Sequence, residues 1–160
     1  MPVSGNCTSV EYGDPFDVMG DQSAMRHMNN YHKRQLNWMT SVNVQDIASD
    51  GIYNLANPEQ SSAAVQVIRL IRNVTGNVTR DYYYLEYRRP YGVFDNFPAS
   101  DPVVNGISIR IAPPFTAPTQ SKIIDTTENT ATFGDASLGL GRICCDGIFN
   151  ISVTALAINS

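Results

Sequence analysis

From residue 42 onward the chain is built of short runs in which apolar and polar residues alternate, and no long helical pattern follows. The clearest run covers residues 105–111, where three isoleucines are predicted to face a core while Ser108 and Arg110 face solvent. The last run, residues 149–154, alternates in the same way and directs Asn150 outward. Because a period of two residues fits an extended strand with one buried face, these runs predict a mainly β fold, arranged as an antiparallel β-sandwich.

Further segments rich in β-branched and aromatic residues add strands to this fold. Residues 51–55, 64–71, 81–88 and 121–125 are predicted strands. The Asn and Gly residues at positions 73–77 form a turn signal between two of them. We therefore expect 64–71 and 81–88 to pair as a hairpin.

The N-terminal part has a different character. Residues 1–20 are punctuated by Gly, Pro and Asp and are predicted to form a loop. Residues 23–39 predict one α-helix capped by Ser23, with Trp38 near its end as an anchor for packing. The chain is thus divided into an N-terminal unit, residues 1–40, and a β unit, residues 41–160. The helix prediction depends on an apolar stripe at three- and four-residue spacing, formed by Met25, Met28, His32, Leu36 and Met39.

Composition and charge exclude several classes of protein. Among the 160 residues, 42% are hydrophobic and 16% are charged, as in an ordinary globular chain. The net charge of -4 argues against nucleic-acid binding, because proteins that neutralise phosphates carry a basic face. No apolar run approaches the length of about 20 residues that a membrane span needs.

Four matches to the N-glycosylation pattern point to a secreted or extracellular protein, although the pattern is short enough to occur by chance. No signal peptide is visible at the N-terminus. The candidate acceptors are Asn6, Asn73, Asn77 and Asn150.

The three cysteines leave the disulfide pattern open. Cys144 and Cys145 are adjacent, and a bridge between them would strain the tight ring. Cys7 could pair with one of them or with a cysteine upstream of this chain. Three reduced thiols in a core are an equally good interpretation.

Residues 11–20, Glu-Tyr-Gly-Asp-Pro-Phe-Asp-Val-Met-Gly, carry the most specific pattern. With His27, Asn29, His32 and Trp38, they resemble the segment that follows the zinc-binding helix in gametolysin-like zinc metallopeptidases. The resemblance runs over residues 10–157 with order and spacing kept. The later matches are Tyr83-Tyr84-Leu85-Glu86-Tyr87-Arg88, Asn105-Gly106-Ile107 with Arg110, Ile124-Asp125-Thr126-Thr127, Asp135-Ala136-Ser137-Leu138 and Gly141.

The resemblance implies roles for several residues of the N-terminal part. Met19 would be the methionine of a turn that lies beneath the zinc-binding histidines of a metzincin-like catalytic domain. Residues 23–39 would be the helix that follows this turn. Asn37, where the family usually has glycine, and the Cys144-Cys145 pair depart from the pattern. The structural residues expected around the turn and helix are Asp14, Asp17, Gly20, His32 and Trp38.

The zinc ligands and the catalytic glutamate are absent from this chain. The family binds zinc through a His-Glu-x-x-His helix, and neither His27 nor His32 belongs to such a motif. Five residues apart, these two histidines would lie about 140° apart around a helix and could not share a metal on one face. We therefore predict no catalytic residue and no metal ligand here, and assign zinc to the full-length family enzyme.

Two functions remain from the sequence. The first is the C-terminal part of a secreted zinc metalloendopeptidase acting on extracellular or cell-wall glycoproteins, not catalytic by itself. Its partners would be an upstream catalytic segment of the same protein and the protein substrate. The alternative is a non-enzymatic β-sandwich that binds a glycoprotein, a glycan or a partner subunit through a face formed by Tyr82, Tyr84 and Arg88. A plain cross-strand ladder of Tyr and Arg explains that face as well.

Overall fold

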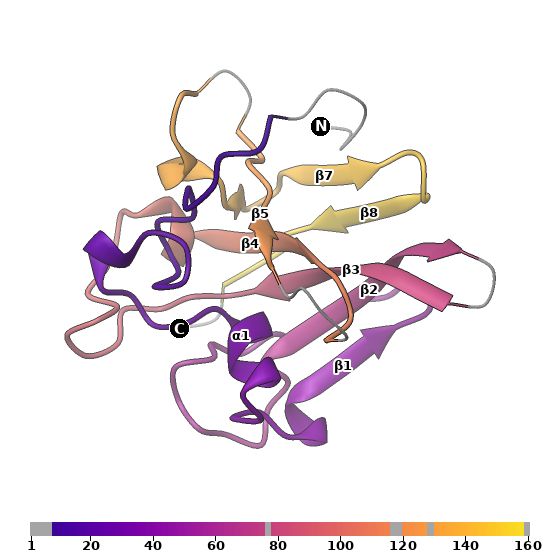
Figure 1. Ribbon diagram of the computed structural model, residues 1–160, viewed down its shortest axis with the longest axis horizontal. Coiled ribbons are helices and arrows are strands. Elements are labelled where there is room, and N and C mark those ends of the chain that lie inside the picture. The colour runs from indigo at the N-terminus through magenta and orange to yellow at the C-terminus, as the bar shows by residue number, and fades with distance from the viewer. Residues whose placement is uncertain (1–7, 76–77, 116–119, 128–129, 159–160) are drawn as a thin grey trace.

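The computed structural model describes residues 8–75, 78–115, 120–127 and 130–158, and is mainly β (Figure 1). Six strands form one sheet of order β1-β2-β3-β4-β5 with β6 beside β4, and β7 pairs with β8 in a second sheet. The mainly β prediction is confirmed. The strands are β1 Val44–Ile47, β2 Val67–Thr75, β3 Val78–Glu86, β4 Gly106–Ala112, β5 Lys122–Ile123, β6 Leu138–Gly139, β7 Ile143–Asp146 and β8 Ile151–Thr154.

The large sheet is mixed rather than antiparallel, because β1 runs parallel to β2. A parallel pair needs a crossover connection, and residues 48–66 provide it. The predicted strand at 51–55 is therefore wrong, since this segment is an irregular part of the crossover in which Tyr53 and Leu55 pack against the core. The predicted hairpin is confirmed, with β2 and β3 antiparallel and Leu70 opposite Tyr83.

Both faces of the central strands are buried, and they are buried by different parts of the chain. On one face, Ile68, Leu85 and Ile109 pack with Cys144 from the β7–β8 sheet. The opposite face, which carries Tyr84, is covered by the N-terminal segment through Tyr31 and Met39.

The expectation that Ser108 and Arg110 face solvent is wrong, because both are fully buried, Ser108 against Ser137 and Arg110 against Asp14 of the N-terminal segment. The alternation predicted for the last strand is confirmed, with Ile151 and Val153 partly buried and Ser152 and Thr154 exposed.

The helix is much shorter than the stripe at residues 23–39 predicted. α1 spans Asn30–Gln35, and its N-cap is Asn29 rather than Ser23, with the Asn29 side chain accepting from the backbone N–H of His32. Met25 adopts a left-handed conformation with φ 47°, which separates α1 from a short 3₁₀ turn before it. The remaining short helices are 3₁₀ turns at Gln22–Ala24, Ser41–Asn43, Pro102–Val104 and Phe133–Asp135.

The end of α1 shows how the chain accommodates an unusual residue. Asn37 follows the helix with φ 59°, in the left-handed region where glycine is most common and asparagine is tolerated. The departure from the family pattern at this position thus keeps a residue suited to the same backbone shape.

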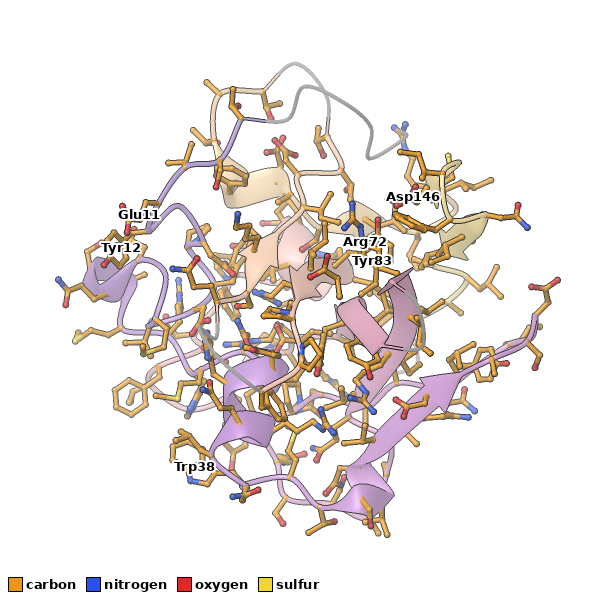
Figure 2. The ribbon with its side chains drawn as sticks, turned by 45° about the vertical axis from the view of Figure 1, so that its right-hand side comes forward. Glu11, Tyr12, Trp38, Arg72, Tyr83 and Asp146 are labelled. Carbon is orange, nitrogen blue, oxygen red and sulfur yellow. The ribbon has the colours of Figure 1, made fainter. Side chains whose placement is uncertain are left out.

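Side-chain contacts fix the β7–β8 sheet onto the large sheet. The Tyr83 hydroxyl of β3 donates to Asp146 Oδ2 of β7 at 2.5 Å, and Arg72 Nε donates to the same hydroxyl at 3.0 Å. Figure 2 shows the three side chains close together on this side of the molecule. Burial and the Asp146 carboxylate raise the pKa of Tyr83, so its hydroxyl stays a donor over the ordinary pH range.

Candidate functional site

Residues 14–21 form a compact turn, here called the Met19 turn, that is held by its own polar groups. Asp14 Oδ1 accepts from the Phe16 N–H and Asp17 Oδ1 from the Met19 N–H, each at 3.0 Å. The Asp21 N–H closes the turn by donating to the Asp14 carbonyl at 2.9 Å. These bonds use the two aspartates as local backbone partners, the role that the Asp-Pro pattern predicts.

Gly20 is required by close packing within this turn. A Cβ at Gly20 would lie 2.5 Å from the carbonyl oxygen of Asp14 and 2.7 Å from its Cβ. No side chain fits there without moving backbone, which supports the structural role expected for Gly20.

The Met19 turn is tied to the sheet through a buried arginine. Arg110 of β4 donates from Nε to Asp14 Oδ2 at 2.8 Å and from Nη1 to Glu86 Oε2 at 2.6 Å. Phe16 packs edge-on against Phe97, with ring centroids 6.0 Å apart. The turn is thus fixed in position by both charge and packing.

Although its flanking aspartates are buried, the Met19 side chain is 54% exposed at the apex of the turn. Trp38 is 66% exposed and so does not anchor the N-terminal segment within this chain, contrary to its expected role. Figure 2 shows Tyr12 and Trp38 on the same side of the molecule. The N-terminal segment therefore presents several apolar side chains to solvent, namely Val10, Tyr12, Met19, Met25, Leu36 and Trp38.

His32 lies behind the turn in a polar cluster, with a side chain that is 12% exposed. Its Nε2 is 3.3 Å from Ser121 Oγ and 3.5 Å from Asp17 Oδ2, and its Nδ1 is 3.2 Å from Gln35 Oε1. The Asn29 amide donates to Ser121 Oγ at 2.8 Å and to the Asp17 carboxylate. Burial raises the pKa of Asp17, partly countered by Arg110.

The contact between Ser121 and His32 does not form a nucleophile–base pair. The same ring nitrogen faces the Ser121 hydroxyl and the Asp17 carboxylate, whereas a catalytic relay places the nucleophile and the orienting acid on opposite nitrogens of the histidine. The cluster instead joins the Met19 turn, α1 and the segment before β5. This agrees with the structural role expected for His32 and Asp17.

A buried charge network lies beneath the N-terminal segment. Arg88 contacts Asp95 at 2.7 Å, Glu59 at 3.0 Å and Glu86 at 3.4 Å. Lys33 of α1 reaches Glu59 at 3.9 Å and donates to the Pro58 carbonyl at 2.9 Å. With the Arg110 pairs, the members of this network are Asp14, Lys33, Glu59, Glu86, Arg88, Asp95 and Arg110.

Carboxylates outnumber cations in this network by four to three, counting Asp14, Glu59, Glu86 and Asp95 against Lys33, Arg88 and Arg110. Arg88 Nε and Glu59 Oε1 lie 3.0 Å apart as an ion pair, but they do not form a hydrogen bond with each other. Burial raises the pKa of Glu59 to about 7, with Arg88 acting in the opposite direction. Burial raises the pKa of Glu86, but Arg110, Arg88, Lys33 and the Asn30 N–H together lower it below its ordinary value.

The possible binding face of the alternative function, formed by Tyr82, Tyr84 and Arg88, is not available on the surface. Arg88 is fully buried in the network, and Tyr84 is 1% exposed beneath Tyr31, with ring centroids 5.1 Å apart. Tyr82 is partly buried, and the Arg69 guanidinium lies 4.5 Å from its ring. The prediction of which β3 side chains share a face is correct. The face with Tyr82, Tyr84 and Arg88 is covered by the N-terminal segment, which the alternation alone could not indicate.

Sequence reasoning did not identify Glu59, Lys33 or Asp95 as members of a buried network. A signal was available in the strand at 81–88, where Glu86 and Arg88 share a face with two tyrosines. Charged residues on an aromatic strand face are commonly buried only when paired. Their partners come from distant loops, so no local pattern could name them.

The two histidines lie in different surroundings. His27 packs against the rings of Phe94 and Tyr91, at centroid distances of 5.5 and 6.2 Å, whereas His32 belongs to the polar cluster. Within the described ranges, no group of three or more His, Cys, Asp or Glu side chains is arranged to hold a metal ion.

Cys144 is buried and Cys145 partly buried, and both are free thiols. Burial raises the pKa of Cys144. Cys7 and the sequon residues Asn6 and Asn77 lie outside the described residues.

Among the other sequon residues, Asn150 is exposed, with φ 53°, at the turn between β7 and β8, where a glycan would have access. The backbone of Asn73 lies in β2, and its side chain is outside the description. In the part of the chain that the structure describes, no helix has both the length and the apolar character to cross a membrane.

Comparisons of the chain with protein-family models, with curated proteins and with solved structures gave no match.

Proposed function

We propose that this chain is the C-terminal part of a secreted zinc metalloendopeptidase of the gametolysin-like type. The Met19 turn and α1 would complete the base of the catalytic domain, and the strands from residue 44 onward would form a β-sandwich docked on it. The zinc ligands and the catalytic glutamate would come from an upstream segment of the same protein. The substrates would be extracellular or cell-wall glycoproteins, and the chain alone would not be catalytic.

The rigid presentation of Met19 carries this proposal. The turn is closed by four short-range hydrogen bonds and a buried salt bridge, yet its apolar apex faces solvent. Burying a methionine side chain stabilises a protein by roughly 1.5–3 kcal/mol, so leaving one exposed on a fixed turn gains nothing for this chain alone. An exposed methionine on a fixed turn is what we expect if an upstream part of the protein packs against Met19.

Two further observations support the proposal. The exposed apolar side chains Tyr12, Met25 and Trp38 belong to the same N-terminal segment, which is where the resemblance would place the contact with an upstream catalytic unit. The exposed sequon residue Asn150 is compatible with a secreted protein. The residues that fix the turn, Asp14 and Gly20, are also those that match the family pattern.

The transcript sequence upstream of Met1 tests the proposal directly. We expect an in-frame His-Glu-x-x-His motif there. A protein that includes this segment should bind one zinc ion per chain, measured by elemental analysis, and should cleave gelatin. Replacing the glutamate of the motif with glutamine should abolish cleavage and leave zinc binding intact.

Residues 1–160 expressed alone serve as the matched control and should neither bind zinc stoichiometrically nor cleave gelatin. An upstream reading frame without the motif, together with a longer protein that binds no zinc, would refute the proposal.

A non-enzymatic binding module is the second candidate function. The Tyr82, Tyr84 and Arg88 face cannot serve it, because two of these side chains are buried. The observation that favours it is an open apolar groove on the opposite face of the large sheet.

A further inference from the structure

A groove of about 1270 Å³ lies between the crossover loop 48–56 and the C-terminal residues 150–158. Its floor lies on the face of the large sheet that also packs against the β7–β8 sheet. The floor is mainly apolar, and the walls add exposed apolar side chains, with Ile52 82% and Leu156 62% exposed. The partly exposed floor residues are Ile47, Leu70, Tyr87 and Ile107, and the buried core residues Ile68 and Leu85 lie beneath them.

β8 borders this groove with a free edge. All residues of Asn150–Thr154 line the groove, whereas none of β7 does, so β8 stands between β7 and the groove. Within the described residues, β7 is the partner of β8 in its two-stranded sheet, and no backbone hydrogen bond joins β8 to the crossover loop. In an antiparallel pair only alternate residues bond to the partner, so the other backbone groups of β8 point toward the groove.

The lining also defines the charge of an occupant. Asp50 is the one ionisable acid or base among the groove residues, apart from the tyrosine phenols. An anionic ligand would therefore find no counter-charge and a cationic one only Asp50, while an extended chain with neutral, alternately apolar side chains would satisfy both the free edge and the apolar floor.

We infer that the groove binds an extended peptide segment of another protein by strand addition to β8. The bound segment would form backbone hydrogen bonds with the free edge of β8 and place every second side chain on the partly exposed floor side chains Ile47, Leu70 and Ile107. The groove lies on the face opposite to the Met19 turn, so this site does not depend on an upstream catalytic segment.

Fluorescence anisotropy with the chain 1–160 tests this inference. The probe is a fluorescein-labelled, lysine-capped peptide of alternating valine and threonine. A second probe has the same side chains but carries N-methyl groups on alternate amides, which removes the donors that strand pairing needs. We expect saturable binding of the first probe and at least a tenfold weaker binding of the second.

Two exposed positions provide matched variants of the protein. Leu156→Asp places a charge in the groove and should raise the Kd of the first probe by at least tenfold. Ile148→Asp makes the same kind of change on the β7–β8 turn, at a side chain that is 66% exposed and does not line the groove. It should leave the Kd unchanged, and circular dichroism of both variants should match the unmodified chain.

Each other outcome overturns the inference. Equal binding of both probes would show that the groove recognises apolar surface without strand pairing. Loss of binding in Ile148→Asp but not in Leu156→Asp would place the site elsewhere. A concentration-dependent dimer in sedimentation, abolished by Leu156→Asp, would identify a second copy of this chain as the occupant, and absence of any binding would leave no peptide site.

Discussion

Replacing Arg110 with methionine should lower the free energy of unfolding by about 3 kcal/mol. Arg110 is fully buried and contacts Asp14 at 2.8 Å and Glu86 at 2.6 Å. Removing one partner of a buried ion pair leaves uncompensated charge and typically costs roughly 3–5 kcal/mol. We expect the lower end of this range, because the Glu86 carboxylate would still contact Arg88 at 3.4 Å and accept from the Asn30 N–H at 2.7 Å.

Thermal unfolding followed by circular dichroism measures this effect. For a domain of this size, each kcal/mol shifts the Tm by roughly 2–4 °C, so Arg110→Met should lower it by about 6–12 °C. Hydrogen exchange gives a second readout, since the amides of Phe16 and Met19 bond to aspartates of the turn that Arg110 holds. These two amides should exchange faster in the variant.

Asp46→Asn provides the control for a charge pair at the surface. Asp46 is paired with Arg69, but its side chain is 61% exposed, and such pairs contribute about 0–1 kcal/mol. If Arg110→Met lowers the Tm no more than Asp46→Asn does, the argument that buried charge holds the N-terminal segment on the sheet is wrong.

Three further changes test other parts of the structure. The pKa of Glu59 is about 7 in the folded protein against an ordinary value of 4.5, so the folded state binds this proton more tightly, and the associated stability is present below pH 4.5 and lost as the pH rises through 7. Glu59→Gln should therefore flatten the fall of Tm between pH 5 and about pH 7.5, measured by calorimetry. Gly20→Ala should destabilise the chain by about 2 kcal/mol or more in urea unfolding, because its Cβ would meet the Asp14 backbone at 2.5 Å. Tyr83→Phe leaves the buried Asp146 carboxylate without its hydroxyl donor and should cost about 1–3 kcal/mol in the same assay.

Each of these changes has a matched control in the chain. Glu11→Gln alters an exposed carboxyl and should leave the pH profile of the Tm unchanged. Gly139→Ala adds a Cβ whose nearest neighbour lies 3.8 Å away, an ordinary contact. Tyr12→Phe removes a hydroxyl from a side chain that is 72% exposed. A control as destabilising as its partner variant would contradict the reasoning for that pair.

The alternation of apolar and polar residues was sufficient to predict the strands that have one apolar face and one polar face. Period-two alternation located β4 and β8, and a turn signal between two apolar runs located the β2–β3 hairpin. The same reasoning misplaced the first strand. Residues 51–55 have strand-like composition but lie in a crossover, and only the parallel pairing of β1 with β2 makes that connection necessary.

The errors at the candidate site share a physical cause. The apolar spacing of residues 23–39 suits a helix, yet Met25 takes a left-handed conformation and the helix begins only at Asn30. The alternation predicts that the face with Arg88 and Arg110 is exposed to solvent, because the N-terminal segment that covers it lies far away in sequence. Asp14 meets Arg110 across 96 residues, a pairing that no local pattern contains.

The two faces of the large sheet are therefore specified by different interactions. Apolar side chains such as Leu85 and Ile109 hold one face, and such packing tolerates small shifts of position. On the other face, the buried side chains of Arg110 and Glu86 bond to the N-terminal segment through Asp14 and the Asn30 N–H, and a shift of that segment would break these two contacts. Buried ion pairs are seldom more stabilising than apolar packing, so we infer that this network is retained for position rather than for stability. A fixed position is what the Met19 turn would need under the proposed function.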